Sequence, residues 1–306
     1  MSDDIQENII VTNDEVTLVE LFTVLWKKKI LITGISLIFA VSSVYYSLSL
    51  PNIYLSDVVL KVAGTSGSSL SSKSQLGGIA ALAGVNLGKG DALSEKANLA
   101  KQVIRSRDFA KHISSFPEVL PALMALEEYD ATTQSMVFIE NVYDPANQKW
   151  LGTLPSENEV YKKYLSMVNV FIDPDTEFLA ISIEHQSPYF AKYFLELIIT
   201  ELNNIERHRD ITQAKRSTAY LTEQLGIYKV ADIRNSINSL IQSQLETEML
   251  ANVRIEYLLR PLDSAYVPEK KSGPARAVIC IAGTFIGFLL GIFFVFTNHY
   301  LLRKTS

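Results

Sequence analysis

The chain has 306 residues, a net charge of −5 and a mean hydropathy of +0.14. The acidic balance gives no reason to expect nucleic-acid binding, and 48% hydrophobic residues is high for a soluble protein but too low for a polytopic one. The only cysteine, Cys280, lies inside an apolar run, so we expect the polar part of the chain to be held by burial and assembly, without disulfides.

Two uncharged apolar runs lie near the ends of the sequence, at residues 30–50 and 277–302. Each can cross a bilayer, because ~20 helical residues span the ~30 Å hydrocarbon core. A cleaved signal peptide is the alternative for the first run. An acidic leader and a poor cleavage site at residues 47–51 favour an uncleaved anchor instead.

Basic residues predict the orientation, because basic segments next to membrane spans stay in the cytoplasm. Lysines at 27–29 precede the first span, and basic residues at 303–304 follow the second. Basic residues at 270, 271 and 276 argue for the opposite orientation, but the first span usually dominates. The prediction is cytoplasmic tails at 1–29 and 303–306, transmembrane helices at 30–50 and 277–302, and a periplasmic domain at 51–276.

The first part of the exported segment mixes a strand, a loop and a helix. Alternating β-branched residues predict a strand at 54–62. Residues 64–90 are rich in Gly, Ser and Ala, and predict either a flexible insertion or a contact surface for a partner or lipid. Residues 92–116 have helical spacing, and Pro117 and Pro121 are expected to end that helix.

Two weak apolar pieces, 137–142 and 150–154, precede a clearer hairpin. The hairpin consists of residues 163–173 and 177–184, with its turn at Asp173-Pro174-Asp175. Proline suits this turn because its φ is fixed and it has no N–H to donate.

The most regular region is helical and covers residues 188–260. Ser187 is a suitable N-cap and Pro188 a suitable first helical residue. A continuous helix would be a rod of about 110 Å, and its narrow apolar stripe favours packing against neighbouring subunits, as in a coiled coil. Two helices folded back at Gly226 are the alternative. The stripe comprises Phe190, Phe194, Leu197, Ile198, Leu202, Ile205, Ile233, Ile237, Leu240, Ile241, Leu245 and Met249.

A proline-containing linker, residues 261–274, joins this region to the second span. Pro261, Pro268 and Pro274 disfavour helix and stiffen an extended chain.

Three glycines at four-residue spacing form one face of the second span: Gly283, Gly287 and Gly291. Such a face lets another helix approach closely in the membrane. Its partner could be the first span, a neighbouring subunit or another membrane protein.

No pattern for catalysis, cofactor binding or metal binding survives inspection. The four histidines are scattered without metal-ligand spacing. Residues 84–91 fail the phosphate-binding pattern because Gly90 follows Lys89. We therefore expect no enzyme activity, no cofactor and no metal.

These features together resemble the chain length determinant (Wzz-type) family of polysaccharide co-polymerases, over nearly the whole sequence. The motifs are Leu21-Phe22, Leu25-Trp26-Lys27, Pro51-Asn52-Ile53-Tyr54, the Gly/Ala/Leu loop, Val103-Ile104-Arg105-Ser106-Arg107 and Ser187-Pro188-Tyr189-Phe190-Ala191. One departure is the linker, where the family's prolines stand closer together. This leaves the geometry of the linker open.

The resemblance implies an α+β membrane protein of the bacterial inner membrane, with two transmembrane helices flanking a periplasmic α/β base and a long projecting helix. It also implies a homo-oligomer that sets the modal length of a lipid-linked surface polysaccharide, such as lipopolysaccharide O-antigen, made by a separate polymerase. The family has no agreed catalytic residues.

Three other functions compete with this scaffold role. An exopolysaccharide or capsule co-polymerase or export adaptor would dock an outer-membrane channel or a separate kinase. A two-span sensor would need a cytoplasmic signalling module, which the four residues after Leu302 are not expected to supply. An anchored glycan hydrolase or transferase would need carboxylates that converge in a cleft.

Overall fold

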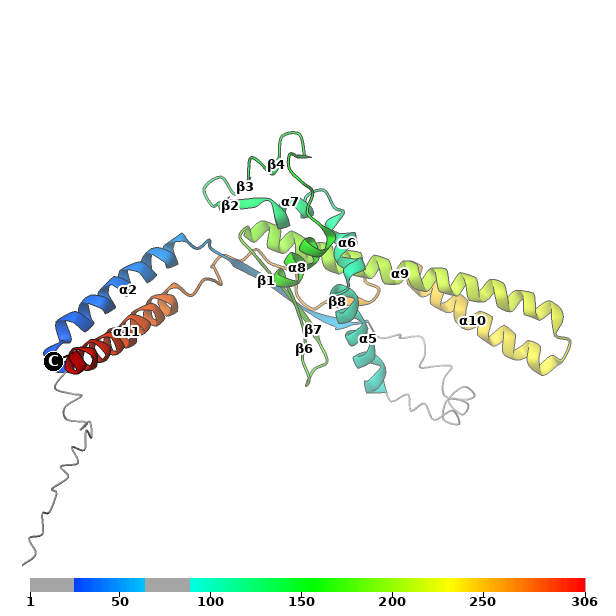
Figure 1. Cartoon of the computed structure of the whole chain (residues 1–306). Helices are drawn as coiled ribbons and strands as arrows, with labels where there is room; N and C mark the ends of the chain where they lie inside the picture. Colours follow the sequence, from blue (N-terminus) through cyan, green and yellow to red (C-terminus); the bar gives the residue numbers. More distant parts are fainter. Residues whose placement is uncertain (1–24, 64–88, 306) are drawn as a thin grey trace, which may run out of the picture. The chain divides into compact units, whose positions relative to one another are not determined.

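The computed structural model describes residues 25–63 and 89–305 and divides the chain into two compact units (Figure 1). One unit consists of Met1–Pro51 and Gly273–Ser306, and the other of Asn52–Ser272. Most of the predicted tail at 1–29 and loop at 64–90 lies outside the described residues.

The first unit is a pair of apolar helices, α2 (Lys29–Ser49) and α11 (Arg276–Thr305), which pack side by side. Both predicted apolar runs are therefore helical. Lys29–Ser49 and Arg276–Asn298 are long and apolar enough to cross a membrane.

The second unit contains a four-stranded sheet in the order β6-β7-β1-β8, in which every neighbouring pair is antiparallel. Strand β1 occupies the predicted range, and β6 and β7 form the predicted hairpin. The carboxylate of Asp173 accepts from the backbone N–H groups of Asp175 and Thr176 in the turn, and these hydrogen bonds lower its pKa. The strands are β1 (Tyr54–Val62), β6 (Val168–Ile172), β7 (Leu179–His185) and β8 (Leu259–Pro261).

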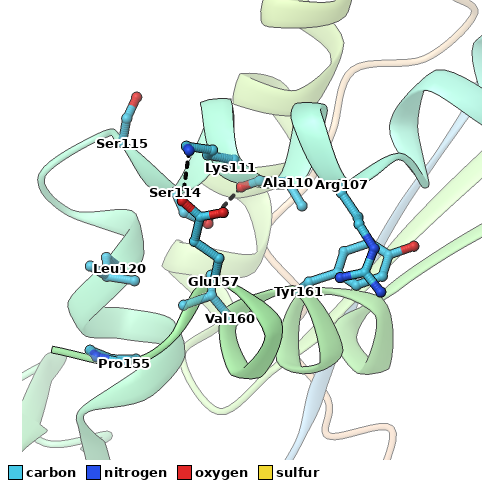
Figure 2. A pocket seen from close by; sticks show the side chains of 10 residues that line it. All are labelled: Arg107, Ala110, Lys111, Ser114, Ser115, Leu120, Pro155, Glu157, Val160 and Tyr161. Carbon is cyan, nitrogen blue, oxygen red and sulfur yellow. Dashed lines mark hydrogen bonds and ion pairs between the residues drawn. The ribbon is translucent and has the colours of Figure 1, made fainter.

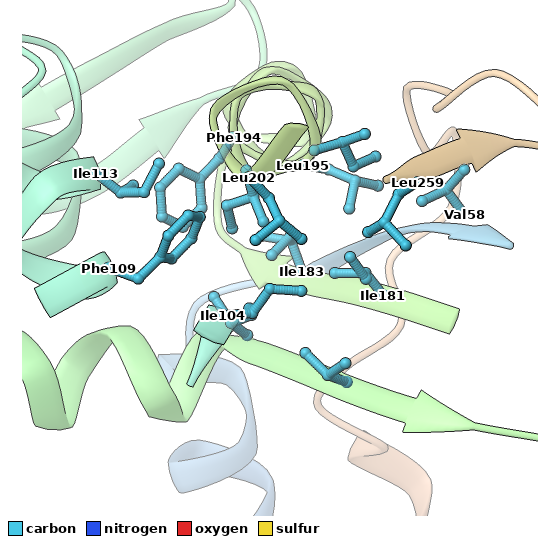
Figure 3. Packing of buried hydrophobic residues seen from close by; sticks show 14 of the residues in the cluster. Val58, Ile104, Phe109, Ile113, Ile181, Ile183, Phe194, Leu195, Leu202 and Leu259 are labelled. Carbon is cyan, nitrogen blue, oxygen red and sulfur yellow. The ribbon is translucent and has the colours of Figure 1, made fainter. Parts of the chain in front are cut away.

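Helices cover the apolar face of this sheet, and two small two-stranded sheets extend from them. Alternate residues of β1 and β7 point into the core, where they meet Phe194 and Leu202 from α9 (Figure 3). Complete burial of each such side chain stabilises the fold by about 1.5–3 kcal/mol. The elements are α5 (Lys89–Ile104), α6 (Arg107–Ser114), α7 (Val119–Met124), β2 (Leu126–Asp130), β3 (Ser135–Phe138), β4 (Tyr143–Asp144), β5 (Lys149–Trp150), α8 (Glu157–Met167) and α9 (Pro188–Ile227).

Two local expectations were wrong. The helix predicted at 92–116 is two helices, because Ser106 accepts from the N–H of Phe109 and starts α6. Pro121 does not end a helix but lies within α7, near its first turn, where the missing N–H costs nothing.

The prediction also missed helix α8 and assigned its last turns to the hairpin. Its sequence signal is a capping box, in which Ser156 and Glu159 bond reciprocally through side chain and backbone. Three buried residues at helical spacing follow it: Val160, Tyr164 and Met167.

The continuous rod expected over 188–260 is also wrong, and the two-helix alternative is right. Helix α9 ends at Ile227, and α10 (Ala231–Val253) runs back along it (Figure 1). The break lies just beyond Gly226, where Tyr228 and Val230 are extended. The small buried residues Ala214 and Ala251 belong to the faces that let these helices pack closely.

Candidate functional site

The three glycines predicted as a contact face lie along α2, within the helix pair. A Cβ added to Gly283 would lie 2.4 Å from Ser43 Cβ, and one added to Gly287 would lie 2.5 Å from Phe39 Cβ. Both distances are shorter than van der Waals contact, so a side chain at either position would push the helices apart. The same face thus has a partner within this chain, the first candidate span.

The third glycine extends this contact toward the other end of α2. A Cβ on Gly291 would lie 3.2 Å from the Cα of Ile32. Between these points, Ser36 Oγ donates to the carbonyl oxygen of Thr284 at 3.3 Å. Small residues and the hydrogen bond between Ser36 and Thr284 therefore help to hold the pair, as expected where lipid replaces water.

Residues 103–107 form the junction at which helix α5 ends and helix α6 begins. Tyr164 Oη donates to the carbonyl oxygen of Ile104 at 2.8 Å, and Tyr161 Oη donates to that of Arg105 at 2.9 Å. Both tyrosines belong to α8. They satisfy carbonyl groups that the end of a helix leaves without partners, so the motif is a structural junction.

A pocket of about 200 Å³ lies beside this junction, between α6 and α8 (Figure 2). The guanidinium of Arg107 stacks 4.6 Å from the centre of the Tyr161 ring and donates to Asn158. Lys111 and Glu157 pair at 2.6 Å, and this hydrogen bond and charge raise the pKa of Lys111. The basic groups of this pocket are thus already partnered, which makes it a surface feature of the junction.

The start of α9 is fixed by a buried cap. Ser187 Oγ accepts from the N–H of Phe190, and Pro188 is the first helical residue, as predicted. His185 Nδ1 accepts from the N–H of Ser187, so Nε2 carries the proton and faces the carbonyl oxygen of Ala122 at 3.2 Å. Burial lowers the pKa of His185 to about 4, so it is neutral at pH 7.

The root of the α9–α10 hairpin is held by polar side chains of α9. Asn203 bonds with the backbone of Leu258 and Leu259, and Arg207 donates to the carbonyl oxygen of Arg254 at 2.8 Å. These bonds fix the chain between the end of α10 and β8. No sequence pattern pointed to either residue, since their partners lie far along the chain.

The second half of α10, toward the root of the hairpin, exposes apolar side chains. Leu245 and Met249 lie one turn apart and are 45% and 67% exposed, whereas Ile237 is buried against α9. The predicted stripe therefore divides into a packed part and an exposed part. The exposed part is a candidate surface for another protein chain.

The structure does not gather the six other predicted residues into one site. Pro51 precedes β1, Tyr54 is its first residue, Pro188 starts α9, and Pro261 ends β8. Pro268 is buried, and Pro274 follows a cis peptide bond. Each of these residues therefore shapes the backbone at its own position and is not part of a shared site.

The side chains of the described residues form no group of three or more His, Cys, Asp or Glu that could hold a metal ion. The carboxylates of Glu206 and Asp210 lie along α9, where burial raises the pKa of Glu206 and Asp210 accepts from Tyr257 Oη. Glu206 and Asp210 also face arginine and tyrosine partners, so we assign them to the packing of the hairpin root.

One comparison with known proteins agrees with the family expected from the sequence. Residues 14–115 match the sequence model described as "Chain length determinant protein" (Wzz). A search of curated proteins gives no match. A solved structure of a "full-length bacterial polysaccharide co-polymerase" is similar, with 10% identity, a TM-score of 0.40, and coverage of 95% of this chain and 100% of that one. The match over residues 14–115 therefore confirms the resemblance of the sequence to chain length determinant proteins.

Proposed function

We propose that the protein sets the modal chain length of a lipid-linked surface polysaccharide, most plainly lipopolysaccharide O-antigen, as an oligomeric inner-membrane scaffold without catalytic activity of its own. The family match over residues 14–115 is the observation that carries this proposal. The partners would be further copies of the chain, the bilayer, a separate polymerase and its glycan.

The order of the two units along the sequence supports this role. Both apolar helices belong to one unit, and the whole of Asn52–Ser272 lies between them in sequence. With both helices crossing the inner membrane, that segment is held in the periplasm at two points. Two such tethers would prevent this segment from leaving the membrane surface.

The α9–α10 hairpin supplies the surface that this scaffold role needs. Its exposed apolar positions, Leu245 and Met249, would be covered by a neighbouring subunit. A ring of subunits would then influence the chain length at which the polymerase releases its product. It would act through its shape and would not catalyse a reaction.

Deletion of the gene tests the proposal. Surface polysaccharide from the deletion strain, separated on a denaturing gel, should lose its modal band cluster but retain polymer, and the intact gene should restore the cluster. Loss of all polymer would contradict a regulatory role. Unchanged O-antigen with altered secreted polysaccharide would instead support the exopolysaccharide co-polymerase or export adaptor.

A further inference from the structure

A second groove lies on the outer face of the sheet, at the root of the α9–α10 hairpin. It has a volume of about 680 Å³. Three of its lining side chains are cationic (Lys61, Arg254 and Arg260) and one is anionic (Glu256). The lining thus has an excess of positive charge, and none of these residues belongs to the pocket beside α6.

Two of the cations lie directly opposite one another. Lys61 in β1 pairs with Arg260 in β8 across the antiparallel ladder, so both side chains point to the same face. The flanking residues Leu60, Val62 and Leu259 are buried on the core side, which places the two cations outward. Like charges at such a position destabilise a sheet. Glu256 reaches Arg260 at 3.4 Å, so one carboxylate stands beside this opposed pair of cations.

The backbone that presents the groove is rigidly held. Asn203 and Arg207 of α9 bond to backbone groups of residues 254–259, so the chain that carries Arg254, Glu256 and Arg260 cannot readily move to separate the charges. Positions fixed in this way are typical of preorganised binding sites. A bound anion would offset the repulsion without any rearrangement.

We propose that this groove binds an anionic group of a glycan, a carboxylate or a phosphate. The guanidinium group of Arg260 can bind either in a bidentate manner, and the opposed Lys61 adds a point charge. That the anion belongs to a glycan rests on the proposed function, whereas the anion site itself rests on the groove alone.

The test measures binding to the full-length chain in detergent micelles by isothermal titration calorimetry. The probes are a glucuronate-containing oligosaccharide, inorganic pyrophosphate and the neutral maltohexaose. We expect saturable binding of at least one anion, weaker at high salt because ions screen exposed charges, and no binding of maltohexaose. The anion that binds identifies carboxylate or phosphate as the ligand group. Equal binding of the neutral sugar, or no saturable anion binding, would overturn the proposal.

A double variant, Lys61→Gln with Arg260→Gln, removes the opposed cations and should weaken anion binding about tenfold or more. The matched control, Lys229→Gln with Arg234→Gln, removes two cations near the hairpin tip and should bind as the intact chain does. Unchanged affinity in the groove variant, or equal loss in the control, would overturn the site.

Thermal unfolding without ligand separates binding from folding. Because the opposed charges repel, Lys61→Gln should leave the melting temperature unchanged or raise it. A fall of several degrees would mean that Lys61 serves the fold, and would count against the proposal. The glycan profile of the deletion strain tests the scaffold role independently of these binding measurements. Absence of anion binding would therefore reject the groove as a site, whereas an unchanged glycan profile would reject the scaffold role.

Discussion

Asn203 in α9 is bonded on both sides of its amide to Leu259 in β8. Its Oδ1 accepts from the backbone N–H of Leu259 at 2.8 Å and also from that of Leu258, and its Nδ2 donates to the carbonyl oxygen of Leu259 at 3.0 Å. The side chain is buried, and it bonds to backbone groups of the edge strand β8 that no neighbouring strand pairs with in the described sheet. Asn203 therefore joins helix α9 directly to strand β8.

Replacement of Asn203 by Ala should destabilise the fold strongly. Three buried backbone groups would lose their partners, and each unsatisfied group costs about 1–3 kcal/mol. We expect a loss of at least about 2 kcal/mol in the free energy of unfolding, measured by urea denaturation of the detergent-solubilised chain. Asn204→Ala is the matched control, because its amide bonds only to the side chain of Glu201. Equal midpoints for the two variants would refute the role of Asn203.

Gly287→Leu should disrupt the helix pair, because even a Cβ would lie 2.5 Å from Phe39 Cβ. Overpacking of this kind typically costs about 1–3 kcal/mol, and the backbone of Ser36 leaves little room to relax. We expect a lower melting temperature in micelles and, in cells, an altered glycan length.

Gly34→Leu provides the control for this prediction. Gly34 lies in α2 and has nothing within 4 Å of a built Cβ, so the same increase in size meets open space. The two variants should differ clearly. If both lower the melting temperature equally, the glycine face does not hold the pair.

Local chemistry made several elements predictable. The strand at 54–62, the turn at Asp173-Pro174-Asp175 and the cap at Ser187 each depend on neighbours within a few residues. The three glycines were predictable as a contact face for the same reason. Their partner was not, because α2 lies more than 200 residues away in sequence and three partners fitted the pattern equally well.

The features of the fold that could not be predicted from the sequence depend on contacts between residues far apart in the chain. Tyr164 secures the end of α5 by a bond to Ile104, sixty residues earlier. The return of α10 along α9 buries small residues such as Ala214 and Ala251, which add little to an apolar stripe. Likewise, Lys61 and Arg260 meet only through strand pairing. None of these relationships has a local pattern.

The buried His185 should make stability depend on pH. Burial lowers its pKa from 6.5 to about 4 in the folded state, so the unfolded chain takes up a proton first as the pH falls. The stabilisation is complete above pH 6.5 and is lost progressively between pH 6.5 and 4. At about 1.4 kcal/mol per unit, the loss can reach about 3 kcal/mol.

Urea denaturation at pH 7 and pH 5 measures this dependence. His185→Gln should have a smaller difference between the two midpoints, although it is less stable at pH 7 because a buried hydrogen-bonded group has changed. His208→Gln, on the exposed side of α9, should keep the difference seen in the intact chain. A difference that persists in full without His185 would assign the dependence to other groups.

The exposed apolar side chains of α10 should control assembly. Leu245→Asp combined with Met249→Asp would place two carboxylates where a neighbouring subunit is proposed to pack, and burial of unpaired charge is costly. Mass photometry of the chain in nanodiscs should therefore show smaller oligomers, and the modal glycan cluster should broaden in cells. Ser243→Asp, exposed on another side of α10, adds a charge away from Leu245 and Met249 and should leave oligomer size unchanged. Normal oligomers in the double variant would locate the subunit contact elsewhere, and smaller oligomers with an unchanged glycan profile would separate assembly from length control.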